Sequence, residues 1–263
     1  MKKALIIFLK IGIFFVGWAV LSGIINIPND NPAIWRFFAE LIPLAVIILF
    51  TIIFLCIEKR TVKIPVIENV GRGTATGVIA GLAWIGISAG ILIFTHQLTI
   101  TEKIEVPMLW LWIISAFFNV VMQELLVRGY IYQLLKLKYN MPVTIVVTTA
   151  IFTLLHGGAF EVGFLPVINV ITMCLFTTAL YESEKTIIAP TMAHAAWNII
   201  GAIVLGGVSL ADDYPRLYTL IPSGNEILSG GNYKIEASVV VLGINIILML
   251  FFYYRYKKKA VNA

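Results

Sequence analysis

Hydrophobic residues occur in long runs along this chain, and short polar stretches separate the runs. Eight runs can be delimited, at residues 4–27, 33–57, 74–97, 107–135, 142–157, 162–181, 186–206 and 237–254. Most are close to the roughly 20 residues with which a helix crosses the hydrocarbon core of a bilayer. The pattern therefore predicts an all-α fold, a polytopic membrane helical bundle of about eight transmembrane helices.

The stretches between the runs are mostly short and rich in Pro, Gly, Asn or charged residues, as in NIPNDNP at 27–33. Only the stretch 207–235 is long, and its PSGN and GGNY segments predict turns in an ordered external loop. We find no internal repeat and no low-complexity tract. Residues 1–263 are therefore predicted to form a single transmembrane domain.

Composition agrees with a membrane protein. Of the 263 residues, 60% are hydrophobic and 13% are charged, whereas a soluble domain carries about 25% charged residues. The net charge of +5 comes without a basic patch interleaved with aromatic residues. The sequence thus predicts the lipid bilayer as a partner and no nucleic acid.

The loop charges predict the orientation of the chain. Lys and Arg collect in cytoplasmic loops. If the N-terminus is cytoplasmic, thirteen of these residues lie inside and four lie outside. An even number of helices returns the chain to the same side, so both termini are predicted to be cytoplasmic.

Charged residues are rare within the apolar runs and are informative for that reason. A charge at the bilayer centre costs about 2.5–3.5 kcal/mol on insertion scales, so such residues usually serve a function. Glu124 and Arg128 are four residues apart and are expected to pair on one helix face. Other polar residues in the runs are Asn119, Gln123, His156, Asn169, His194 and Asn198.

The spacing of these residues repeats in three runs. His194 and Asn198 are four apart, and so are Phe152 and His156, which places a ring one turn from the imidazole. Two interpretations fit any one of these residues: a hydrogen bond that ties helices together, or part of a site. Two histidines, a carboxylate, an arginine and an asparagine on three helices favour a site, since groups of this kind must find one another or water in a membrane.

These three blocks resemble the pattern of the CPBP family. The blocks read QELLVR at 123–128, FTLLH at 152–156 and HAAWN at 194–198, in the family's order. This family contains the CAAX prenyl proteases and bacteriocin-processing membrane proteins, and it is also called Abi or Rce1-like. The segment with the motifs corresponds to about residues 107–206.

The resemblance implies a helical bundle around a polar cavity that opens to the cytoplasm and holds a protease site. In the family, the first glutamate and the histidine of the second block activate a water, and the third block stabilises the oxyanion. Transferred to this chain, His156 acts on the water, and His194 and Asn198 stabilise the oxyanion. Phe152 and Arg128 are accessory. The implied substrate is a membrane-anchored or prenyl-like peptide or protein, and the implied location is a bacterial cell membrane.

The chain departs from the family at Gln123, where the family has its first glutamate. A primary amide does not accept a proton usefully, so Gln123 cannot be the general base. Three alternatives follow: Glu124 turns into the cavity and serves as the base, His156 acts alone, or the site binds without cutting. Glu124 also has a purely structural interpretation, as the ion-pair partner of Arg128.

Metal binding is left open by the sequence. Glu124, His156 and His194 would form a two-histidine, one-carboxylate zinc set. Their spacing lacks the compactness of HExxH.

The function predicted first is an intramembrane endopeptidase. The alternative is a catalytically weakened or inactive member that serves as a binding or regulatory scaffold, for example in bacteriocin self-immunity. A transporter ranks third, because the sequence has no inverted repeat.

Overall fold

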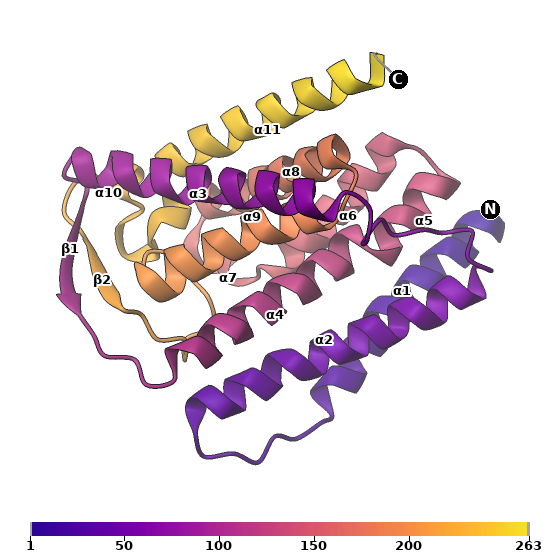
Figure 1. Cartoon of the computed structure of the whole chain (residues 1–263), viewed down its shortest axis with the longest axis horizontal. Coiled ribbons are helices and arrows are strands. Elements are labelled where there is room, and N and C mark those ends of the chain that lie inside the picture. The colour runs from indigo at the N-terminus through magenta and orange to yellow at the C-terminus, as the bar shows by residue number, and fades with distance from the viewer. Residues whose placement is uncertain (1, 262–263) are drawn as a thin grey trace.

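The structure is a computed structural model that describes residues 2–261, so positions 1, 262 and 263 of the predicted domain lie outside the described residues. It is a bundle of long helices with one small sheet at one end (Figure 1). The predicted all-α polytopic bundle is confirmed. The elements in chain order are α1 (Lys2–Gly23), α2 (Pro32–Ile57), α3 (Val70–Phe94), β1 (Leu98–Lys103), α4 (Leu109–Arg128), α5 (Tyr130–Lys138), α6 (Met141–Leu155), α7 (Gly158–Val162), α8 (Phe164–Glu184), α9 (Ile188–Asn198), η1 (Ile199–Val204), β2 (Tyr218–Pro222), α10 (Glu226–Ser229), η2 (Gly231–Tyr233), η3 (Ile235–Ala237) and α11 (Val239–Val261).

Each predicted apolar run contains a helix. Among the described residues, six helical segments are long and apolar enough to cross a membrane: α1, α2, α3, α4 with α5, α8 and α11. Two shorter apolar helices, α6 and α9 with η1, occupy the remaining runs. The protein is therefore a multi-pass membrane protein, while the number of eight crossings stays a prediction.

Local chemistry explains where the helices near the motifs begin and end. The side chain of Asn140 caps α6 by accepting from the backbone N–H of Val143, and Pro142 stands in the first turn. Gly129 separates α4 from α5, and a Cβ at this position would overlap the carbonyl oxygen of Leu125. This break makes Arg128 the last residue of α4.

Small residues allow α3 and α9 to pack closely. Gly73, Gly77 and Gly81 recur every four residues on α3 and face the segment 186–196, which is the small-residue spacing that lets membrane helices approach. On the other side of the bundle, α4 packs against α2, α6 and α9, and α8 packs against α6, α9 and α11. This packing places α4, α6, α8 and α9 around one interior region (Figure 1).

Gly77→Ala is expected to destabilise the protein by about 1–3 kcal/mol, because inserting a methyl group into a packed contact forces the backbones apart. The new Cβ would overlap the carbonyl oxygen of Ala189 and lie 2.8 Å from the Cβ of Met192. Thermal unfolding in detergent measures the change. Gly86→Ala is the matched control on the same helix, because its Cβ would meet nothing within 4 Å. Equal unfolding temperatures for the two variants would contradict this packing.

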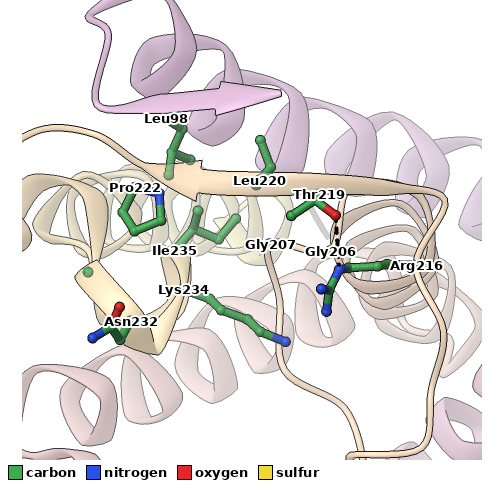
Figure 2. Close-up of a pocket in the computed structure, with 11 residues that line it drawn as sticks. Leu98, Gly206, Gly207, Arg216, Thr219, Leu220, Pro222, Asn232, Lys234 and Ile235 are labelled. Atoms are coloured by element: carbon green, nitrogen blue, oxygen red, sulfur yellow. Dashed lines mark hydrogen bonds between the residues drawn. The ribbon is translucent and has the colours of Figure 1, made fainter. Parts of the chain in front are cut away.

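A two-stranded sheet closes one end of the bundle, and the sequence did not predict it. Strand β1 pairs with β2 antiparallel, with Leu98 opposite Pro222 and Ile100 opposite Leu220. The predicted ordered loop 207–235 thus contains a strand and short helices. Beside β2 lies a pocket of about 180 Å³, into which Arg216 and Lys234 bring positive charge (Figure 2). Burial lowers the pKa of Lys234. Gly206 and Gly207, which follow η1, also line this pocket.

Candidate active site

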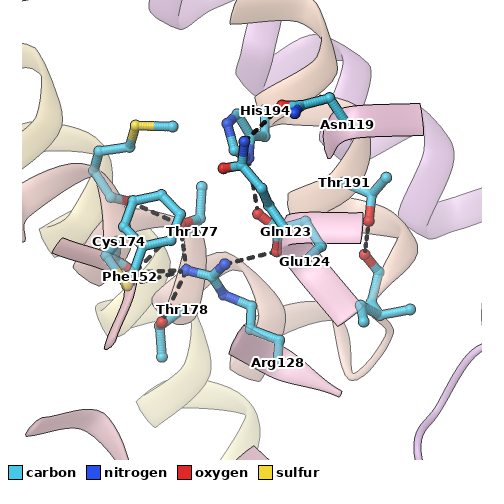
Figure 3. A network of polar contacts seen from close by, with 12 residues as sticks. Asn119, Gln123, Glu124, Arg128, Phe152, Cys174, Thr177, Thr178, Thr191 and His194 are labelled. Carbon is cyan, nitrogen blue, oxygen red and sulfur yellow. Dashed lines mark hydrogen bonds and ion pairs between the residues drawn. The ribbon is translucent and has the colours of Figure 1, made fainter. Parts of the chain in front are cut away.

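Glu124 lies at the centre of the candidate site and has both carboxylate oxygens engaged. Its Oε2 accepts from Nη1 of Arg128 at 2.6 Å, and its Oε1 is 3.0 Å from Nδ1 of His194 (Figure 3). The side chain is fully buried. The predicted pairing with Arg128 is present, and the contact with His194 joins the first motif block to the third across 70 positions. With both oxygens bound, Glu124 is arranged to hold its two partners.

Arg128 is anchored by α8 as well as by Glu124. Its Nη2 donates to the carbonyl oxygen of Cys174 at 2.9 Å and to the hydroxyl of Thr177 at 2.5 Å, and Thr178 lies at 3.2 Å. The guanidinium is fully buried and lies 5.9 Å from the centroid of the Phe152 ring. A planar fork with several donors suits this arrangement, because it can bind a carboxylate and the polar groups of a second helix at once. Arg128 therefore links α4, α6 and α8.

His194 projects from α9 and is buried beside Glu124. An ionised carboxylate can only accept hydrogen bonds, so the imidazole Nδ1 must donate to it. In the neutral ring, this contact leaves Nε2 as a lone-pair acceptor. A buried acid that fixes the tautomer of an imidazole in this way prepares the other nitrogen to take a proton.

Phe152 and His156 bring the second block to the same region. Helix α6 ends at Leu155, directly before His156 and the pair Gly157 and Gly158. Nδ1 of His156 lies 2.8 Å from the carbonyl oxygen of Phe152. Because a carbonyl oxygen only accepts, Nε2 of His156 is also left as the acceptor in the neutral ring. The Phe152 ring centroid is 4.3 Å from that of His156 and 6.2 Å from that of His194. His156 thus joins the site through Phe152.

Asn198 follows His194 by one turn of α9 and is buried. Directly after it, residues Ile199–Val204 form a π-helix, a wide turn that occurs often at functional sites. The neighbouring Trp197 stacks on Trp84 of α3, with centroids 4.0 Å apart. This stacking fixes the end of α9, and with it the position of the Asn198 backbone.

A family comparison covers this part of the chain. Residues 105–200 match the model of the family described as type II CAAX prenyl endopeptidase Rce1-like. This segment, which is a little over a third of the chain, belongs to the Rce1-like, or CPBP, family. The match contains all three motif blocks and runs from the approach to α4 through α9. It identifies the fold as that of a CAAX-type intramembrane protease. Comparisons with curated proteins and with solved structures gave no significant match.

Gln123 is the residue that the sequence resemblance led us to expect in place of the family's first glutamate. Its Nε2 donates to Oδ1 of Asn119 at 2.6 Å, and Nδ2 of Asn119 donates to Oε2 of Glu40 at 2.9 Å. Glu40 was not among the predicted site residues, although it is the single acidic residue in the apolar run 33–57. An isolated acidic residue in an apolar run was the signal that could have identified Glu40 as a candidate. Glu40 is 5% exposed, so α2 contributes a buried carboxylate next to the Rce1-like motifs.

The zinc set considered for this Rce1-like site does not fit the side chains. Within residues 2–261, no group of three His, Cys, Asp or Glu side chains is placed to hold a metal ion. Both oxygens of Glu124 are bound by Arg128 and His194, and Nδ1 of His156 faces a carbonyl oxygen.

Proposed function

We propose that this chain is an intramembrane endopeptidase that hydrolyses membrane-anchored peptide or protein substrates in a bacterial cell membrane. The observation that carries the proposal is the buried contact between Glu124 and Nδ1 of His194. It leaves Nε2 of His194 as an acceptor within a family of intramembrane proteases. A general base in such an arrangement contributes roughly 10²–10⁴-fold to the rate.

In the proposed mechanism, His194 is the base, in place of Glu124 and His156, the two candidates that the sequence offered. Nε2 of His194 takes a proton from water, the water oxygen bonds to the scissile carbonyl carbon, and Glu124 stabilises the resulting imidazolium. The carboxamide N–H of Asn198 donates to the oxyanion. The imidazolium then returns its proton to the amide nitrogen as the carbon–nitrogen bond breaks, which gives a carboxylic acid and an amine. His156, whose Nε2 also accepts, orients the water or the substrate.

His194→Ala is expected to lower the peptidase rate at least about 100-fold, because the proton acceptor is lost. The measurement is cleavage of fluorogenic peptides, prenylated and unprenylated, by protein purified in detergent or reconstituted in vesicles. His96→Asn is the matched control: His96 is exposed on a loop far along the chain from the motifs, and asparagine tolerates its positive φ of 57°. Unchanged cleavage by His194→Ala would contradict the assignment of the base.

A second function is favoured by Gln123 and by the fully engaged Glu124. With no free carboxylate at the site, the chain would be an inactive relative that binds peptides as a scaffold, for instance in bacteriocin self-immunity. The same peptide panel separates the two functions. Peptide binding without cleavage, in the wild type and in all variants, would support the scaffold.

A further inference from the structure

A line of hydrogen-bonded side chains runs from Glu40 on α2 through Asn119 to Gln123, beside the candidate site. Glu40 accepts three of them: from Nδ2 of Asn119 at 2.9 Å, from Nη1 of Arg36 at 3.1 Å and from the hydroxyl of Tyr214 at 3.3 Å. Arg36 also pairs with Asp213. Glu40 thus meets only donors, and it acts as an acceptor at both oxygens.

Glu40 determines how the two amides beyond it are oriented. The oxygen and nitrogen of a carboxamide are alike in shape, so their positions must be decided by the hydrogen-bond network. Because Glu40 accepts, Asn119 must present its NH₂ group to Glu40 and its oxygen to Gln123. Gln123 must then present its own NH₂ group to Asn119.

The carbonyl oxygen of Gln123 is what remains at the end of this line. It is buried and has no hydrogen-bond partner within residues 2–261. Leaving a buried acceptor unpaired is unfavourable, and a bound water is the usual partner for such a group. In Figure 3 the Gln123 side chain reaches toward Asn119 and away from Arg128. Its backbone directly precedes Glu124, the partner of His194.

We propose that Glu40 is a positioning residue that, through Asn119, aims the carbonyl oxygen of Gln123 at the water that His194 activates. This inference deepens the proposed endopeptidase function and rests on it. A carbonyl oxygen in this place accepts a hydrogen bond from the water, as one oxygen of the family's glutamate would, while the proton transfer falls to the imidazole. Glu40 thus supplies a carboxylate at one end of this line, and Gln123 supplies an uncharged acceptor at the other.

This arrangement tolerates a carboxylate at one end only. With Gln123→Glu alone, a carboxylate oxygen would face the oxygen of Asn119, and two acceptors would oppose each other. With Glu40→Gln added, the new amide at position 40 can donate to Asn119, which then turns its NH₂ group to the new carboxylate. Arg36 keeps Asp213 as its ion-pair partner in either case. The double variant reverses the two hydrogen bonds that join positions 40, 119 and 123 and keeps both of them.

The test compares the wild type, Gln123→Glu, Glu40→Gln and the double variant in full-length protein. We expect each single variant to lose about tenfold in kcat with little change in KM. The double variant should regain at least the wild-type rate. A coupling of this size is typical of residues in one hydrogen-bond network. The rate of the double variant should also fall at acidic pH, where the carboxylate introduced at position 123 becomes protonated. A purely structural role would not produce this pH dependence. Glu58→Gln is the control, a buried carboxylate at the end of α2 that pairs with Lys10.

Thermal unfolding of the same four proteins separates this inference from the proposed function. Coupling in both activity and unfolding temperature supports the positioning role. Independent effects of the two changes on unfolding temperature, or an unchanged rate in Glu40→Gln, would overturn it. If the unfolding temperatures are coupled but no protein cleaves any peptide, the proposed function and the catalytic use of the line both fail, although the amide orientation holds.

Discussion

Arg128→Met is expected to destabilise the protein by about 3–5 kcal/mol, because it leaves the buried carboxylate of Glu124 without its counter-ion. The variant also frees the polar groups of α8 that Nη2 binds, at Cys174 and Thr177. Unfolding by heat or by denaturant, carried out in detergent, measures the loss of stability. The effect should be among the largest for any single substitution in the bundle.

Two further variants identify the cause of that loss. Glu124→Gln combined with Arg128→Met removes both charges, and it should recover a large part of the stability lost by Arg128→Met alone. Arg72→Met is the matched control, because Arg72 is 53% exposed and its partner Glu184 keeps Arg255 and Lys259. Its expected effect is within about 1 kcal/mol. A similar loss in Arg72→Met and Arg128→Met would show that the burial of Glu124 carries no special cost.

Glu124→Gln is expected to lower kcat by roughly 10²–10⁴-fold while the protein stays folded. An amide at position 124 can donate to Nδ1 of His194, which moves the ring proton to Nε2 and removes the proton acceptor. Arg128 retains its contacts with Cys174, Thr177 and Thr178, so α8 still holds the guanidinium. The measurement is the rate on the best peptide of the panel, at a temperature where unfolding shows the variant to be folded.

Glu182→Gln provides the comparison for this second effect. Glu182 is also a buried carboxylate, and it pairs with Lys136 and Lys185 away from the motifs. We expect the peptidase rate of Glu182→Gln to change no more than about threefold, because its ion pairs lie near the surface and contribute little energy. If Glu124→Gln retains the wild-type rate, Glu124 serves only as the ion-pair partner of Arg128, and His194 needs no orienting acid.

The helices follow from the sequence because a bilayer leaves the backbone few choices. Each backbone polar group must be satisfied within its own segment, so an apolar run of sufficient length becomes a helix. The same local reasoning predicted the pairing of Glu124 with Arg128, four residues apart. The three motif blocks predicted the family, which the match over 105–200 confirms.

The contacts between distant segments could not be derived from the spacing of residues. Strands β1 and β2 are separated by more than 100 positions, and their short sequences, LTITEK and YTLIP, favour no particular partner. The contact between Glu124 and His194 was equally beyond local reasoning, since His194 lies on another helix. The sequence left the base role open among Glu124, His156 and neither, and the proposed mechanism assigns it to His194 for this reason.

Sequence alone determined that this is a membrane bundle with a Glu–Arg pair and two histidines in its interior, because helix periodicity and the cost of burying charge act locally. Only the tertiary structure decided what those groups do. The packing of α9 against α4 binds Glu124 to His194, and the packing of α2 against α4 connects Glu40 to Gln123 through Asn119. A side chain on one helix determines whether its partner on another helix donates or accepts only when the two are in contact. That contact depends on how the helices pack.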